Sequence, residues 1–196
     1  MTMKKGLLII LSGPSGVGKG TLRNSIMRDE SLNLVYSISM TTREKRNKEE
    51  DGVDYYFVSD AEFQKNIDSG NFLEWAEFVG HRYGTPRDKV ESLRNQGYNV
   101  FLEIEINGAK QVMEHVREAN DDRALTIFLM PPSLDALEER IRRRKTESDD
   151  IIKERLEKGK KEMTMTEDYD YVVLNDKIDR ASNEIIAIIK NKMKEK

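Results

Sequence analysis

The sequence predicts an α/β fold in which a parallel β-sheet is covered by helices on both faces. Short, mostly apolar segments alternate along the chain with longer segments of helical periodicity. The apolar segments end at glycine, proline or acidic turn residues, as the strands of a buried sheet do. The chain has 196 residues, with no internal repeat and no Pro/Gly/Ser-rich linker. That length suits one domain with a substantial core, so a single α/β unit is expected.

Four apolar segments are the expected strands of this sheet, because each is short, rich in branched or aromatic residues and bounded by turn residues. They are GLLIIL (6–11), NVFLEIEI (99–106), ALTIFLM (124–130) and YDYVVLND (169–176). Two more short strands, YSISM (36–40) and DYYFVS (54–59), are expected around the charged loop 41–52.

Helices are expected wherever apolar residues recur with helical spacing. The segments are 21–29, 60–70 with Asp60 as its N-cap, 108–120, 133–145, 148–165 and 179–193. The polar segment 41–79 and the charged helices around 133–155 are expected to be excursions from the core.

Composition excludes several classes of protein. Lys and Arg number 33 against 36 Asp and Glu, so the chain does not have the excess of basic residues that a nucleic-acid-coating protein needs. There is no cysteine, which removes disulfides, thiolate catalysis and cysteine metal sites. No apolar run approaches the length of about 18 residues that a membrane span requires. We therefore expect a cytoplasmic protein without nucleic-acid or membrane partners, and protein partners are not required.

The segment GPSGVGK (13–19) directly follows the first apolar strand and precedes a helix. It fits the first seven positions of the phosphate-binding motif G-x-x-x-x-G-K-[ST]. Glycines let the backbone N–H groups turn inward as a nest for phosphate oxygens, the helix N-terminus adds a positive dipole end, and Lys19 adds a mobile cation. The sequence therefore predicts a nucleoside triphosphate site at Gly13, Pro14, Ser15, Gly16, Val17, Gly18, Lys19, Gly20 and Thr21.

One position departs from the motif. Gly20 stands where Ser or Thr is usual, and Thr21 follows one residue later. The form GKGT resembles that of nucleoside monophosphate kinases such as adenylate kinase. Whether Thr21 or only Lys19 organises the magnesium stays open at this point.

Several spaced motifs closely resemble guanylate kinase, in that family's order. They are SISMTTREKR (37–46), DGVDYYF (51–57), FLEWAEFVGHRYGTP (72–86), LEIEINGA (102–109), PPS (131–133), RRRKTES (142–148) and VVLND (172–176). The likeness covers roughly residues 6–189. It implies an ATP:GMP phosphotransferase that uses Mg²⁺ with ATP. The implied P-loop core spans about 1–36, 86–132 and 156–196, the GMP-binding subdomain about 37–85 and the helical lid about 133–155.

Arginines are expected around the phosphate of the acceptor nucleotide. Arg43 and Arg46 offer guanidinium forks for a phosphate, and Tyr55 and Tyr83 offer hydroxyl donors without adding charge. By resemblance these four residues bind the phosphate of GMP.

The resemblance also assigns the residues that recognise the base. Glu74 matches the family's carboxylate and Ser39 its hydroxyl, with Thr85 assisting at the edge of the site. Guanine presents adjacent N1–H and N2–H₂ donors, which one carboxylate accepts together, and an O6 acceptor for a hydroxyl. Adenine has an acceptor at N1 and would face the carboxylate badly.

Glu103 and Glu105 are expected on one face at the end of a buried strand, where α/β active sites form. The resemblance puts this pair between the nucleotides, and Glu103 among the GMP-binding residues. Thr21, Glu103 and Glu105 are the candidate metal-binding residues, acting through water. The family more often has aspartate at position 105.

The charged helices near the C-terminal third match the family's lid. Arg144 and Arg155 align with its two lid arginines, Arg140 with another phosphate-facing arginine, and Lys145 replaces a glycine. An arginine brought in by a closing lid stabilises the charge of a transferring phosphoryl group. Arg142 and Arg143 are expected to form a solvated helical face.

By resemblance Asn175 and Asp176 meet the adenine of ATP. Catalysis is then expected from Lys19, Arg43, Arg144 and Arg155, through positioning and charge neutralisation.

Two alternatives stay open. One is a non-catalytic guanylate-kinase-like module that binds phosphopeptides, which the intact glycine loop and lid arginines argue against. The other is a kinase for another nucleoside monophosphate, which Ser39 and Glu74 argue against.

Overall fold

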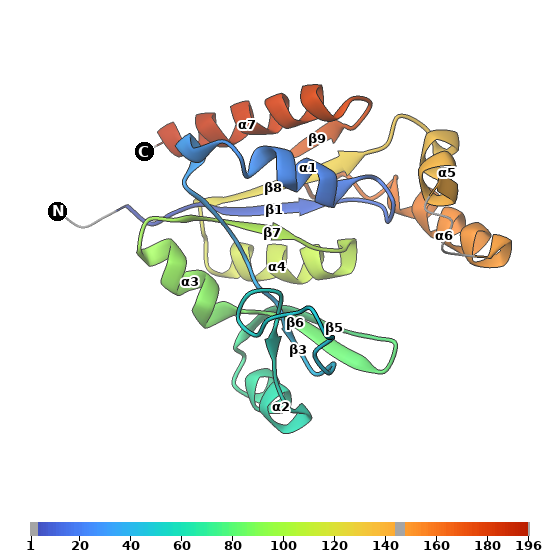
Figure 1. Ribbon diagram of the computed structural model, residues 1–196. Helices are drawn as coiled ribbons and strands as arrows, with labels where there is room; N and C mark the ends of the chain where they lie inside the picture. The colour runs from blue at the N-terminus through green and yellow to red at the C-terminus, as the bar shows by residue number, and fades with distance from the viewer. Residues whose placement is uncertain (1–3, 144–147, 196) are drawn as a thin grey trace.

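The central β-sheet is parallel and carries helices on both faces, as the sequence predicts (Figure 1). The computed structural model describes residues 4–143 and 148–195. Within them the sheet has five strands in the order β2-β7-β1-β8-β9. Their bounds are Leu34–Tyr36 for β2, Asn99–Glu103 for β7, Leu8–Ser12 for β1, Ala124–Met130 for β8 and Tyr171–Leu174 for β9. Each neighbouring pair is parallel, so the carboxyl ends of the strands meet at one edge.

Helices cover the sheet in two layers. α1 (Lys19–Ile26) and α7 (Ile178–Lys194) lie on one face, and α3 (Arg87–Asn95) and α4 (Ile106–Glu118) on the other (Figure 1). Side chains of β1 alternate between the two layers because successive residues of a strand point to opposite faces. Ile9 belongs to the cluster that contains Ile185 of α7, and Ile10 to the cluster that contains Val112 of α4.

A second, smaller sheet lies below the first in the view of Figure 1. Its strands have the order β4-β3-β6-β5, with β4 at Tyr56–Phe57, β3 at Met40–Thr41, β6 at His81–Pro86 and β5 at Phe72–Phe78. Its own small core joins Met40 and Phe72 to Phe63 of α2 (Asp60–Asp68). The polar segment 41–79 thus folds around a separate hydrophobic cluster.

Two more helices lie beyond the carboxyl ends of the central strands, α5 (Leu134–Arg143) and α6 (Asp149–Glu162) (Figure 1). They pack on the central core through Leu137, Ile141 and Ile152. Arg144 and Lys145, the expected lid positions between them, lie outside the described residues.

Several expected elements are corrected. The strand expected over 36–40 is split, because β2 ends at Tyr36 on the central sheet and β3 begins at Met40 on the small one. The side chain of Ser59, not Asp60, caps α2, since it accepts the N–H of Glu62. The expected strand 99–106 ends at Glu103, and Glu105 is the N-cap of α4. Strands β5 and β6, helix α3 and the 3-10 turn at Glu30–Leu32 were not expected.

Candidate active site

The glycine loop between β1 and α1 is held in place by close backbone contacts. Gly13 has φ of +150° and Gly18 has φ of +103°. A Cβ atom on Gly13 would lie 2.4 Å from the carbonyl oxygen of Leu129 in β8, and one on Gly18 would lie 2.9 Å from Nδ2 of Asn175. Since neither space nor φ suits a side chain, the loop can adopt this path only with glycine.

Lys19 begins α1, and its side chain lies over the loop. Its Nζ donates to the carbonyl oxygens of Gly13 at 2.6 Å and Pro14 at 3.2 Å. Burial lowers the pKa of Lys19 below its ordinary value, and the carboxylates of Glu103 and Glu105 oppose that shift. A desolvated cation at the start of a helix suits an anionic ligand such as phosphate.

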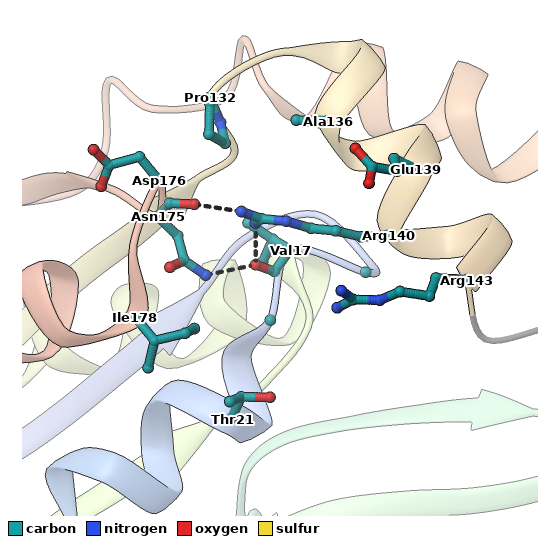
Figure 2. A pocket seen from close by; sticks show the side chains of 12 residues that line it. Val17, Thr21, Pro132, Ala136, Glu139, Arg140, Arg143, Asn175, Asp176 and Ile178 are labelled. Atoms are coloured by element: carbon teal, nitrogen blue, oxygen red, sulfur yellow. Dashed lines mark hydrogen bonds between the residues drawn. The ribbon is translucent and has the colours of Figure 1, made fainter.

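A cavity of about 530 Å³, the triphosphate-side cavity, opens between the glycine loop, α5 and the end of β9 (Figure 2). It is lined by Gly16, Val17, Gly18, Thr21, Pro132, Ala136, Glu139, Arg140, Arg143, Asn175, Asp176 and Ile178. Arg143, which the sequence analysis left on a solvated face, thus lines this cavity (Figure 2).

Arg140 and Asn175 tie the walls of this cavity to the glycine loop. Arg140 donates to the carbonyl oxygen of Val17 at 3.0 Å and to that of Asn175 at 2.7 Å. Nδ2 of Asn175 donates to the same Val17 oxygen at 2.8 Å (Figure 2). Asp176 accepts from Nε of Arg180 at 2.6 Å. Arg140 therefore links α5 to the glycine loop and to the end of β9, and its guanidinium lines the cavity.

A second cavity, of about 290 Å³, lies on the other side of the loop and is called here the transfer cavity. It is lined by Ser15, Gly16, Gly18, Lys19, Gly20, Glu103, Ile104 and Glu105. From α6, Nη2 of Arg155 donates to the Ser15 hydroxyl at 2.6 Å. The expected lid residue Arg155 thus reaches the glycine loop, while Arg144 lies outside the described residues.

A third cavity, of about 560 Å³, lies between the central and small sheets and is called here the acceptor cavity. Its lining includes the expected residues Ser39, Tyr55, Glu74, Tyr83 and Glu103. It also includes Tyr36, Asp54, Ala76, Glu77, Phe78, Ile104, Glu105, Asn107, Gly108 and Lys158.

Glu74 is a half-buried acid on this wall. Its Oε1 accepts the Thr85 hydroxyl at 2.6 Å, and Thr85 is itself buried. Burial raises the pKa of the Glu74 carboxyl, and the hydrogen bond from Thr85 opposes that shift. A Cβ atom on Gly108 would lie 2.9 Å from Oε2 of Glu74, so this glycine leaves room for the carboxylate. A desolvated, oriented carboxylate is suited to bind adjacent N–H donors.

Arg43 is held by an acid that the sequence analysis did not single out. Its two terminal nitrogens donate to Glu49 at 3.0 and 2.8 Å, and its guanidinium lies 5.5 Å from the Tyr55 ring centre. Glu49 also accepts the backbone N–H of Arg46 at 2.9 Å. The hydrogen bonds from Arg43 lower the pKa of Glu49 to about 2. Among the described residues, the lining of the acceptor cavity leaves out both arginines, so they lie next to the cavity rather than in its wall.

Glu103 and Glu105 border both the transfer cavity and the acceptor cavity. They do not share a strand face: Glu103 ends β7, whereas Glu105 is exposed at the start of α4. Glu103 lies 3.1 Å from Nη1 of Arg23, and its Oε2 is buried without a hydrogen-bond partner among the described residues.

The same carboxylates fit a magnesium ion that arrives with a triphosphate. Mg²⁺ is usually held by one or two carboxylates together with substrate phosphates and water. Glu103 and Glu105 supply two carboxylates in the transfer cavity, whereas Thr21 lines the triphosphate-side cavity. Within 4–143 and 148–195 no three acidic, histidine or cysteine side chains cluster as a self-sufficient metal site.

Sequence reasoning missed several charged residues of this site, among them Arg23, Glu49, Lys158 and Glu162. Arg23 lies four residues after Lys19 in α1, and Lys158 three residues after Arg155 in α6. Residues at these spacings share a helix face. Arg23 and Lys158 could therefore have been predicted from the positions of Lys19 and Arg155, which the sequence analysis did identify. Glu162 likewise lies one helical turn after Lys158, whereas Glu49 pairs with arginines of its own loop and belongs to no motif that pointed to it.

Comparison with known proteins gives one family. The family model described as guanylate kinase matches residues 5–192. The solved structure of guanylate kinase from Anaplasma phagocytophilum is 32% identical, with all of this chain and 90% of that chain covered at a TM-score of 0.73. A shikimate kinase from Bacteroides thetaiotaomicron is 17% identical, covers 94% of this chain and 98% of its own, and has a TM-score of 0.46. That second likeness is too distant to bear on fold or activity. No helix within the described residues is long and apolar enough to cross a bilayer.

Proposed function

The chain belongs to the guanylate kinase family, and its α/β structure is that of a P-loop nucleotide kinase. From that premise we propose that it transfers the γ-phosphoryl group of ATP to GMP or dGMP, giving ADP and GDP. The observation that carries the proposal is the half-buried Glu74 carboxylate, oriented by Thr85 in the wall of the acceptor cavity.

Guanine is the base whose edge suits this wall. One carboxylate accepts the adjacent N1–H and N2–H₂ donors, and Ser39 in the same wall donates to O6. An adenine there would displace water from the half-buried carboxylate without offering it donors, which is costly. Glu74 therefore selects the acceptor, while Tyr55 and Tyr83, with Arg43 and Arg46 beside the cavity, bind its phosphate.

The transfer itself requires positioning and charge neutralisation. A phosphate oxygen of GMP is already an anion, so it attacks without a general base. Lys19, the N–H groups of the loop and Arg155 stabilise the charge on the transferring group, and Arg144 is proposed to join them on the lid. Glu103 and Glu105, with Thr21 on the neighbouring cavity, are proposed to hold through water the Mg²⁺ that accompanies ATP, which would neutralise phosphate charge. The core, GMP-binding and lid segments named above are proposed to close over both nucleotides, which excludes water.

Exchange of Glu74 for glutamine tests this proposal. E74Q should reduce kcat/KM for GMP by about 100-fold, because a charged hydrogen-bond acceptor for two donors is lost. The affinity for MgATP, measured by calorimetry, should be unchanged. The matched control is E114Q, at an exposed position of α4. Undiminished activity of E74Q with GMP would show that Glu74 does not recognise the base.

A further inference from the structure

The transfer cavity and the acceptor cavity share one border, formed by Glu103, Ile104 and Glu105. The proposed reaction moves a phosphoryl group from the first cavity to the second. The group must therefore pass over this border. Any cation within reach of the border will interact with the transferring group.

Lys158 places an ammonium group there. It lies in α6, one helical turn after Arg155, and lines the acceptor cavity. Its Nζ is 3.3 Å from Oε2 of Glu105 and 3.6 Å from Oε1 of Glu162. It is also close enough to Lys19 to contribute to the lowered pKa of that residue, after burial and the neighbouring glutamates. Two lysines, one from the loop and one from the lid helix, thus approach the border from different sides.

A purely structural role explains the Lys158–Glu105 pair poorly. The two side chains are 52% and 69% exposed, and an ion pair so accessible to water contributes little to folding. For the same reason the pair costs little to break, so the ammonium can exchange Glu105 for a phosphate oxygen. Glu162 is only 8% exposed, and its Oε2 lacks a hydrogen-bond partner among the described residues. This buried acid keeps the lysine next to the border when Glu105 is released.

We propose that Lys158 is a further catalytic residue, whose ammonium leaves Glu105 and binds the phosphoryl group in transfer. The inference rests on the proposed kinase function. In the step, the bond between the γ-phosphorus and the β–γ bridging oxygen of ATP breaks, and its electron pair stays on ADP. A phosphate oxygen of GMP forms the new bond to phosphorus, and no proton moves. Lys158 stabilises the charge on the equatorial oxygens, together with Lys19.

Steady-state kinetics of K158Q, K158R and K160Q test the proposal. Lys160 is an exposed lysine of the same helix, so K160Q makes the same change of charge away from the border. K158Q should lower kcat by about 100-fold with little change in either KM, the loss typical of one preorganised charge-stabilising group. K158R should recover most of the activity, and K160Q should match the wild type. Equal kcat values for K158Q and K160Q would overturn the proposal, as would a K158R variant no better than K158Q.

A binding measurement separates this proposal from the proposed function. Calorimetry with adenosine and guanosine joined through five phosphates reports on the phosphate chain without turnover. K158Q should bind this probe about 10-fold more weakly than K160Q, because one charge-assisted contact is lost. If the wild type fails to phosphorylate GMP, the proposed function fails, and this comparison still decides the role of Lys158. Equal affinities of the two variants would show that Lys158 does not contact the phosphates.

Discussion

On the triphosphate side of the site, the groups that face the ligand belong largely to the backbone of the glycine loop. On the acceptor side they are side chains, drawn from β5, β6, the end of β7 and the charged loop before β4. The loop keeps its shape because Gly13 lies against β8 and Val17 accepts from both Arg140 and Asn175. The acceptor side keeps its shape through side-chain pairs, Glu74 with Thr85 and Arg43 with Glu49.

This difference explains why the two sides of the site determine different aspects of the reaction. A nest of backbone N–H groups binds phosphate whatever base follows it, so the loop specifies a reaction class. A partly desolvated carboxylate distinguishes bases by their donors, so Glu74 is proposed to specify the acceptor. Substitutions on the loop side should therefore abolish turnover, while those on the acceptor side should change substrate use.

The largest loss is expected from Lys19→Ala. Turnover should fall by about 1000-fold or more, because the cation over the triphosphate is removed. The affinity for GMP, measured by calorimetry, should stay largely intact. Lys110→Ala, at an exposed position of α4, is the control. Turnover retained in the Lys19 variant would break the distinction between the two sides.

Gly13→Ala tests whether contacts with β8 hold the loop. The added Cβ meets the Leu129 carbonyl at 2.4 Å, whereas at Gly70, with φ of +66°, nothing lies within 4 Å. In urea unfolding, G13A should lose about 3 kcal/mol or more and G70A about 1 kcal/mol, since only the first adds a clash to the backbone strain. Similar losses in both would mean that the loop is not fixed against β8.

The affinity for GMP should depend on pH through Glu74. Its pKa is raised above the ordinary 4.5 by burial, and in the proposed binding mode guanine pairs with the carboxylate form. As pH falls through the raised pKa, the carboxyl becomes protonated and affinity should drop by up to about 10-fold per pH unit. E74Q controls for titration of the GMP phosphate. A wild-type profile as flat as that of E74Q would contradict the assignment.

The smallest effect is expected from Glu49→Gln. Because the pKa of Glu49 is lowered to about 2, its pairing stabilises the fold above pH 4.5, and this stabilisation is lost as pH falls toward 2. The variant should melt about 2 °C lower than the wild type at neutral pH, in line with a partly exposed pair in a surface loop. The difference should vanish near pH 2. A difference that persists there would mean that Glu49 acts through packing rather than charge.

The central sheet could be predicted because most of its strands are short apolar runs bounded by turn residues, a pattern that is visible in the local sequence. Residues 124–130 were expected as a strand and form β8 with the same bounds. In the small sheet, the strand expected over 54–59 contains β4, but the longer strands β5 and β6 were not expected. Glu105 was misplaced because alternating apolar residues continue past the end of β7 into α4.

The candidate site likewise has one part that local sequence predicts and one part that it does not. The glycine loop was predictable from spacing, while the acceptor residues were predictable only through resemblance, because single acids and hydroxyls spread over 39–105 form no local pattern. The partners that orient them are Glu49 for Arg43, within one folded loop, and Thr85 for Glu74, across the β5–β6 pair. Pairings of that kind follow from the fold rather than from local sequence.

The most direct measurement is a coupled ADP-release assay with MgATP and each of GMP, AMP, UMP, CMP and dTMP. The account predicts turnover confined to GMP among these acceptors, because only guanine offers two adjacent donors to Glu74. Turnover with AMP at a comparable rate would contradict the role of the half-buried carboxylate. Binding of GMP without turnover of any acceptor would contradict the proposed phosphotransfer and favour a module that only binds.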